Sequence, residues 1–248
     1  MTGQLLVLAH ATDTGASSVA ARLAGRLGSE KVRVVRPEVL GLARWSHRVG
    51  SRGRACTRMT LPNAETLVSA DVGAVLNRIQ YLSVPRFRSA SAKDREYAGA
   101  ELHAVVASWL AEFGDRAIHN VRRHPWVVPF LAHQQWVSAA AANHLPVAPR
   151  KTEIRAGNGA EDVIGGGSLS GSVLVAVGTA AGSLAGEFGE RCIAATRAIG
   201  FPLLEFHFAV EQGNTVLVQV DPLPRLVDPW AACMVSDLLA SLAAGDPL

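Results

Sequence analysis

The sequence predicts an α/β protein, and two patterns lead to that prediction. Residues 4–10 (QLLVLAH) and 31–37 (KVRVVRP) are short apolar runs typical of buried strands, and residues 11–28 between them contain a loop and an amphipathic helix. A strand–helix–strand unit of this kind pairs its two strands in parallel. Residues 200–224 show the second pattern, in which apolar and polar residues alternate along two strands joined by a tight turn.

The two alternating strands organise the C-terminal part of the chain. A turn at 212–214 would pair Glu211 with Thr215 and so set His207 opposite Gln219 and Glu205 opposite Asp221. One face would carry an acid, an imidazole, an amide and a second acid. The alternative interpretation is an ordinary strand pair with one solvated face. We expect Leu217 on the polar face, and on the apolar face Leu204, Phe206, Phe208, Val216, Val218 and Val220.

Composition limits the classes of protein to consider. The chain of 248 residues, 49% of them hydrophobic, is long enough for one large domain or for roughly two to three small lobes. Its formal charge of +3 is a weak excess without an extended Lys or Arg run, so we expect no nucleic-acid partner. Three widely spaced cysteines favour a reducing cytoplasm and match no zinc motif. We also expect neither a signal peptide nor a membrane span.

The loop after the first strand is a candidate ligand site. The carboxyl ends of parallel strands form the edge at which α/β sheets bind ligands, and His10, Asp13 and Gly15 follow such an end. The glycines are too few for a dinucleotide fingerprint. Asp13 or Ser17 could instead serve only as the N-cap of the helix that follows.

The other segments have plainer interpretations. Residues 38–70 are poorly patterned and rich in arginine, so we expect a surface loop there. Residues 92–113 and 130–143 have apolar residues at helical spacing, and Glu101 is expected near the buried edge of the first of these helices, paired with an arginine. Residues 228–245 predict a helix that closes the core or forms a homodimer surface.

Several segments resemble a known family. LVQVDPLPRL (217–226) and AIGFPLLEFHF (198–208) resemble the last strands of ATP-grasp ligases. DVGAVLNRIQYL (71–82) resembles an element in ATP-grasp enzymes that modify ribosomal peptides, the microviridin-ligase type, and Arg78 falls on the arginine of that element. Further segments similar to that type, in the same order along the chain, are 92–113, 118–125 and 131–154, although His133 stands where that type has a lysine.

The resemblance implies a reduced ATP-grasp-like architecture, with a pre-ATP-grasp α/β lobe at 1–125 and a truncated ATP-grasp lobe at 126–248. The family's larger central lobe, with its phosphate-binding lysines, is replaced by residues 151–190, which contain one lysine and a glycine run that we interpret as a linker. The family's magnesium ligands correspond here to His207 or Glu205, to Gln219 and to Asp221. Magnesium prefers anionic oxygen ligands, so we expect no metal and no ATP cofactor.

Three functions remain open from the sequence. The preferred one is an ATP-independent enzyme acting on a peptide or amino-acid-derived metabolite in bacterial specialised metabolism, by acid–base chemistry in the cleft between the lobes. His207 would move the proton, because its charge changes near neutral pH, with help from Glu205 or Asp221. The alternatives are a non-catalytic protein that binds a peptide or partner enzyme, and an ATP-dependent carboxylate–amine ligase. The substrate-binding residues would be Gln219 and the arginines Arg78, Arg86, Arg88 and Arg225, which can hold a carboxylate.

Overall fold

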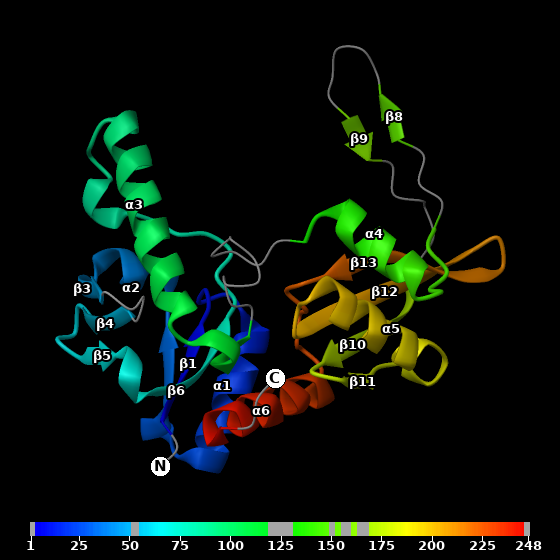
Figure 1. Cartoon of the computed structure of the whole chain (residues 1–248), viewed down its shortest axis with the longest axis horizontal. Helices are drawn as coiled ribbons and strands as arrows, with labels where there is room; N and C mark the ends of the chain where they lie inside the picture. Colours follow the sequence, from blue (N-terminus) through cyan, green and yellow to red (C-terminus); the bar gives the residue numbers. More distant parts are fainter. Residues whose placement is uncertain are drawn as a thin grey trace. The chain divides into compact units, whose positions relative to one another are not determined.

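The computed structural model describes residues 3–50, 55–118, 131–148, 152–154, 160–162 and 169–245. The chain folds into two compact units, Met1–Phe130 with Arg225–Leu248, and Leu131–Pro224 (Figure 1). The boundary expected between residues 125 and 126 lies outside the described residues. The C-terminal segment, residues 225–248, belongs to the first unit and not to the unit that contains the strands before it. The expected division into lobes at 1–125 and 126–248 stays a prediction.

A parallel sheet forms the centre of the first unit. Its strands are β1 (Gln4–Leu8), β2 (Val32–Val35), β6 (Val72–Asn77) and β7 (Ala117–Ile118), in the order β2-β1-β6-β7. The predicted strand–helix–strand unit is confirmed, because α1 (Thr14–Leu27) connects β1 to its parallel neighbour β2. The chain then returns to add β6 on the other side of β1. The direction of strand addition therefore reverses between β1 and β6, at a topological switch point.

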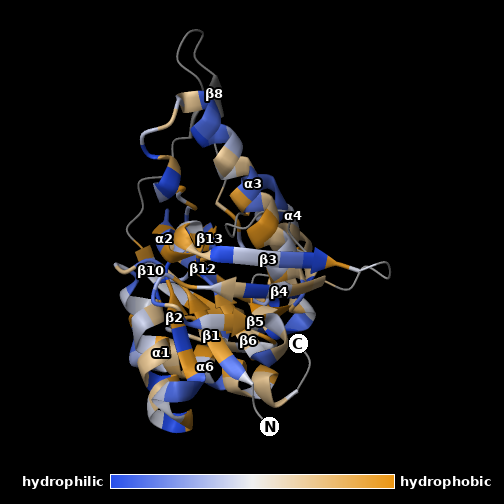
Figure 2. Cartoon of the chain, turned by 90° about the vertical axis from the view of Figure 1, so that its left-hand side faces the viewer, coloured by the Kyte–Doolittle hydropathy of each residue, from blue (hydrophilic) through white to orange (hydrophobic). Residues whose placement is uncertain are grey.

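Both faces of this sheet are covered. Helix α1 packs beside α6 (Pro229–Ala244) and α6 packs on β6. On the other face, Leu6 and Leu8 of β1 join a core with residues of α2 (Pro37–Leu42), α3 (Ala92–Ala111) and a three-stranded sheet. Trp109 of α3 contacts Trp45 and Phe113 edge to face. The most hydrophobic stretches accordingly lie on the inner strands (Figure 2).

The three-stranded sheet corrects the expectation of a loop at 38–70. It consists of β3 (Arg44–Val49), β4 (Ala55–Thr60) and β5 (Thr66–Val68), all antiparallel. The pattern was hard to read because β3 has no buried residue, and only Thr57 and Met59 of β4 are buried. A strand that buries so little carries almost no hydrophobic alternation.

Helix α3 is buried only near its C-terminal end. Ser91 caps its N-terminus, and Val106, Trp109 and Leu110 are its buried residues. Its N-terminal half extends away from the sheet (Figure 1), and Tyr97 is 68% exposed. The expectation that Glu101 lies near a buried edge is wrong, because this residue is exposed.

The second unit is built on an antiparallel sheet. Its strands are β11 (Thr179–Ala181), β10 (Leu169–Ala176), β12 (Leu203–Glu211) and β13 (Asn214–Asp221), in that order. Trp136 of α4 (His133–Ala142) and Phe188 of α5 (Ala185–Ile199) pack with Phe206 and Phe208 in one core. A separate pair, β8 (Thr152–Ile154) and β9 (Ala160–Asp162), precedes this sheet in the chain.

Strands β12 and β13 pair the predicted residues of the polar face with one another, but the turn and the ladder next to the turn differ from the prediction. The turn has two residues, Gln212 and Gly213, both with positive φ, and pairs Glu211 with Asn214. A β-bulge after Leu217 then inserts one residue and restores the pairing of His207 with Gln219 and of Glu205 with Asp221. Leu217 is consequently paired with Phe208 and buried in the core, so its expected place on the polar face is wrong.

Two further observations concern the interior and the membrane. Cys192 of α5 lies in the core of the second unit, and burial raises the pKa of its thiol to about 12, which makes it a packing residue. Among the described residues, no helix combines the length and the apolarity needed to cross a bilayer. The glycine run at 165–167 lies outside the described residues.

The close approach of two backbones generates a stability prediction at Gly15. A Cβ atom on Gly15 would lie 2.0 Å from the carbonyl oxygen of Arg225, whereas one on Gly25 of the same helix would meet nothing within 4 Å. We expect Gly15→Ala to lower the free energy of unfolding by about 1–3 kcal/mol through overpacking. Gly25→Ala should raise it by about 0.5–1 kcal/mol. Urea unfolding of both variants measures the difference, and equal midpoints would contradict the packing described here.

Candidate functional site

The polar face of the second unit brings four predicted residues together on two strands. His207 of β12 is paired with Gln219 of β13 on one side and with Ser172 of β10 on the other. Glu205 lies two residues before His207, opposite Asp221. The ring nitrogen Nε2 of His207 is 3.8 Å from Oε2 of Glu205, and the two side chains are 20% and 17% exposed. They are therefore largely buried but reachable from solvent.

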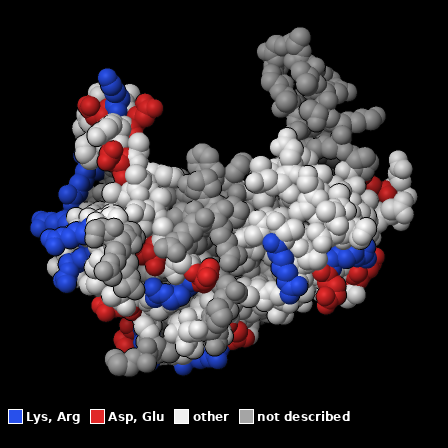
Figure 3. Space-filling view, in the orientation of Figure 1, with Lys and Arg blue, Asp and Glu red and all other residues white. Residues whose placement is uncertain are grey.

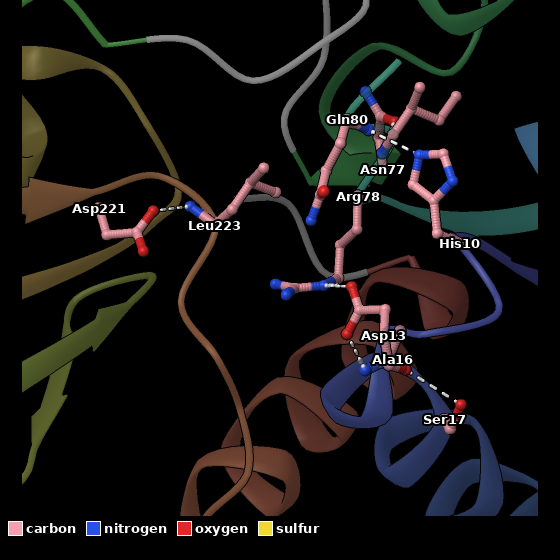
Figure 4. Close-up of polar contacts among 10 residues, drawn as sticks. His10, Asp13, Ala16, Ser17, Asn77, Arg78, Gln80, Asp221 and Leu223 are labelled. Atoms are coloured by element: carbon pink, nitrogen blue, oxygen red, sulfur yellow. Dashed lines mark hydrogen bonds and ion pairs between the residues drawn. The ribbon is translucent and has the colours of Figure 1, made fainter. Parts of the chain in front are cut away.

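The chemistry available on this face is proton transfer. An imidazole beside a carboxylate can exchange a proton with a bound molecule and keep its charge compensated. Asp221 is held in place because its Oδ1 accepts a hydrogen bond from the backbone N–H of Leu223 at 2.7 Å (Figure 4). Gln219 is exposed and offers both a donor and an acceptor.

The same face is a poor match for magnesium. Among the described residues there is no group of three or more His, Cys, Asp and Glu side chains placed to hold a metal ion. Two of the four polar side chains are an imidazole and a neutral amide, whereas Mg²⁺ favours carboxylate and water oxygens. The donor set does not fit the magnesium–nucleotide site that the sequence resemblance implies.

A second polar centre lies in the first unit, at the carboxyl ends of β1 and β6. Asp13 caps α1 by accepting a hydrogen bond from the N–H of Ala16 at 2.8 Å on Oδ1. Its other oxygen, Oδ2, accepts from Nε of Arg78 at 2.7 Å (Figure 4). The side chains of Arg78 and Asp13 are only 4% and 6% exposed. One carboxylate thus fixes both the start of a helix and a buried guanidinium at the switch point of the sheet.

Arg78 retains unused hydrogen-bonding capacity. Its Nη1 is buried and has no hydrogen-bond partner in the described part of the chain. An unpaired buried donor is costly, and an acceptor from a bound molecule would satisfy it. Because Asp13 already neutralises the charge of Arg78, a carbonyl or single carboxylate oxygen fits this position better than a phosphate would.

His10 supports this centre by packing and hydrogen bonding. Its Nε2 accepts a hydrogen bond from the N–H of Gln80 at 3.3 Å, so the proton of the neutral ring lies on Nδ1, 3.6 Å from a carboxylate oxygen of Glu38. The ring stacks on Tyr81 with the centroids 4.0 Å apart. His10 therefore holds the segment that follows Arg78.

The other predicted arginines have exposed side chains. Arg86 donates a hydrogen bond from Nη2 to the carbonyl of Leu42 at 2.6 Å, which ties the turn after β6 to α2. Arg88 and Arg225 have exposed side chains. On the face shown in Figure 3, basic and acidic side chains are interspersed and form no broad basic surface. Substrate binding by these three arginines remains a prediction.

Comparison with solved structures finds proteins of similar fold, whereas comparison of the sequence finds no match. No protein-family model matches the sequence, and no curated protein matches it. The structure is similar to that of macrocyclase MdnC from Microcystis aeruginosa bound with its precursor peptide MdnA, with a TM-score of 0.72 and 10% identity over 96% of this chain and 99% of that chain. The chain has an ATP-grasp-like fold.

Other structures give the same result. Macrocyclase MdnB from the same organism is 13% identical, with a TM-score of 0.68 over 95% of this chain and 98% of that chain. The ATP-grasp ligase PsnB, complexed with a minimal precursor, Mg and ADP, is 12% identical, with a TM-score of 0.64 over 97% of this chain and 98% of that chain. The sequence-based resemblance to ATP-grasp ligases is thereby confirmed at the level of the fold.

The pairing of Asp13 with Arg78 was not anticipated from the sequence, although each residue was singled out alone. The sequence leaves Asp13 either a cap or a site residue, and the structure shows that its carboxylate accepts hydrogen bonds from a helix N–H and from an arginine at once. A signal was present in the sequence, because the two residues follow the ends of neighbouring strands of one parallel sheet.

The buried ion pair generates the second prediction. Asp13→Ala removes the cap and leaves the buried charge of Arg78 unpaired, so we expect a loss of about 3–5 kcal/mol in the free energy of unfolding. The matched control is Asp237→Ala, which removes an ion pair with Arg26 whose side chains are 60% and 58% exposed. That loss should stay below about 1 kcal/mol. Similar losses in the two variants would show that Asp13 is not the anchor described here.

Proposed function

We propose that this protein is an ATP-independent enzyme that modifies a peptide or an amino-acid-derived metabolite, with His207 as the group that moves the proton. The observation that carries the proposal is the polar row of Ser172, His207 and Gln219, with Glu205 beside the imidazole, on three adjacent strands whose other face is core. A proton-transfer site needs an imidazole and a carboxylate close together, and this row provides them.

The peptide part of the proposal is supported by the similar structures. MdnC was solved with its precursor peptide, and PsnB with a minimal precursor. A substrate of the same class suits the chemistry of this chain, because peptides present carbonyl and carboxylate oxygens. Arg78, with its buried and unpaired Nη1, is suited to bind one such oxygen, and Gln219 offers an exposed amide.

The ATP-independent part is supported by the side chains available for charge neutralisation. A triphosphate needs lysines, arginines or magnesium close to it. The polar face of the second unit contributes two carboxylates, an imidazole and an amide, and residues 151–190 contain one lysine, Lys151, and one arginine, Arg155, which both lie outside the described residues. In the proposed reaction His207 accepts a proton from the substrate or donates one to it. Glu205 or Asp221 compensates the charge that forms on the ring.

A non-catalytic peptide-binding protein is the second candidate. It is favoured by the 3.8 Å separation of His207 and Glu205, which is longer than a hydrogen bond. It is also favoured by Asp221, one of whose oxygens is occupied by the N–H of Leu223. In that case the same residues would hold a peptide without turning it over. An ATP-dependent carboxylate–amine ligase is the third candidate, and nucleotide binding tests it directly.

Nucleotide binding is the subject of the third prediction. Calorimetry with Mg-ATP should detect no binding tighter than about 1 mM, a free energy of roughly −4 kcal/mol. The reason is the absence of a magnesium-type donor set on the polar face. Micromolar affinity accompanied by release of ADP in the presence of a peptide would establish the ligase instead.

The fourth prediction separates catalysis from binding at His207. We expect His207→Gln to remain folded, with an unchanged melting temperature, and to lower turnover by about 10²–10⁴-fold, the usual contribution of general acid–base help. Turnover is read as the mass change of peptides encoded beside the gene. The control is His103→Gln, at a partly buried histidine of α3. Full turnover in the His207 variant would favour the binding protein.

A further inference from the structure

A chain of four polar side chains crosses the packing between α3 and the three-stranded sheet of the first unit. Oγ of Ser108, on α3, lies 2.8 Å from Nε2 of His47, on β3. Nδ1 of the same ring lies 2.6 Å from Oγ1 of Thr57, on β4. The hydroxyl of Thr57 bonds in turn to Oε1 of Glu112, the residue that follows α3. Ser108 and Glu112 are four residues apart and share one side of the helix.

We call these four hydrogen-bonded side chains the relay. The donor and the acceptor of each hydrogen bond can be assigned in turn, starting from Glu112. An ionised Glu112 can only accept, so the hydroxyl of Thr57 donates to it. Thr57 Oγ1 must then accept from His47, which places the proton of the neutral ring on Nδ1. Nε2 consequently carries a lone pair and accepts the hydroxyl proton of Ser108. The order is Ser108 to His47 to Thr57 to Glu112.

Thr57 and Glu112 are more deeply buried than His47. Ser108 is partly buried, and the His47 side chain is 15% exposed. The Glu112 side chain is 6% exposed and Thr57 is 0% exposed. Thr57 is further fixed by Ser69, whose Oγ accepts from the Thr57 N–H at 3.1 Å and donates to its carbonyl at 3.3 Å. The hydroxyl end is therefore only partly buried, and the carboxylate end is held in the interior.

We propose that Ser108 is an activated nucleophile that takes an acyl group from reactive esters or thioesters. A hydroxyl hydrogen-bonded to an imidazole, which a third group orients, is the arrangement that activates serine. Oγ forms a bond to the acyl carbon while His47 takes the hydroxyl proton. The carbon–oxygen or carbon–sulfur bond then breaks, and His47 returns that proton to the departing alkoxide or thiolate. The acyl group remains on Ser108 until water, activated by the same ring, removes it.

The position of Ser108 defines the class of acyl donor. It lies in the interior of α3, where backbone N–H groups are already used in helix hydrogen bonds, so its own helix offers no donors to an oxyanion. The relay assists the attack of Ser108 Oγ by taking its proton, but it does little to stabilise the negative charge that develops on the acyl oxygen. The acyl donor must therefore be intrinsically reactive, as aryl esters and thioesters are, and ordinary peptide bonds are excluded.

Acylation of the unmodified protein tests this proposal without any peptide substrate, so it stands apart from the function proposed above. The full chain is incubated with p-nitrophenyl acetate or a fluorophosphonate probe and digested with trypsin. Cleavage after Arg95 and Arg116 releases residues 96–116, in which Ser108 is the only serine. We expect the adduct on Ser108, located by fragmentation that separates it from Tyr97. Because water removes an acetyl group from Ser108 but not a phosphonyl group, a folded protein with no fluorophosphonate adduct at Ser108 overturns the proposal.

Variants test whether the relay causes the reactivity. His47→Gln should acylate about 10²–10⁴-fold more slowly. Glu112→Gln keeps the shape of the side chain, lets the amide donate to Thr57 and should slow acylation severalfold. The matched control, Ser46→Ala, changes an exposed serine next to His47 and should leave the rate at Ser108 unchanged. If the folded variants acylate as fast as the wild type, Ser108 is not activated by this relay. If His47→Gln does not fold, the Glu112 variant and the labelling of the unmodified chain decide the question.

Discussion

The first unit depends on one carboxylate, that of Asp13. It caps α1, the helix that connects β1 to its parallel neighbour β2, and it neutralises Arg78 at the end of β6, the strand added next. A hydrogen bond from the Arg78 N–H to the carbonyl of Leu8 at 2.8 Å joins the two strand ends beside it. Because both partners of the ion pair are nearly inaccessible, neither charge can be compensated by water, and the pair must stay intact for the sheet edge to hold its shape.

In the proposed function, in which Arg78 binds a substrate oxygen, this arrangement relates stability to binding. Asp13 occupies Nε of Arg78 and cancels its charge, and Nη1 is left without a partner among the described residues. A site made in this way is pre-organised, since the guanidinium cannot choose another conformation without leaving a buried carboxylate alone. It is also selective, because a neutralised arginine discriminates by hydrogen-bond geometry more than by charge.

The parallel β1–β2 pair could be derived from two apolar runs that flank an amphipathic helix, and the β12–β13 partners from hydrophobic alternation. The strands β3 to β5 could not, because they bury few side chains and leave no periodic signal. The place of Leu217 could not either, since period-two reasoning assumes an uninterrupted ladder. Polar partnerships such as Asp13 with Arg78, or His47 with Ser108, join residues 65 and 61 positions apart, and only the fold brings them together.

The bulge in β13 has a consequence for how this strand varies between related chains. Val218 is the one residue of the strand that has no counterpart on β12, because Phe208 faces Leu217 and His207 faces Gln219. Removing it would leave every cross-strand partner in place and give a regular ladder with the same residues on each face. The loss of one residue at this point therefore leaves the cross-strand partners of the core and of the polar row unchanged. Related sequences should be aligned with a gap permitted inside this strand, where gaps are normally penalised.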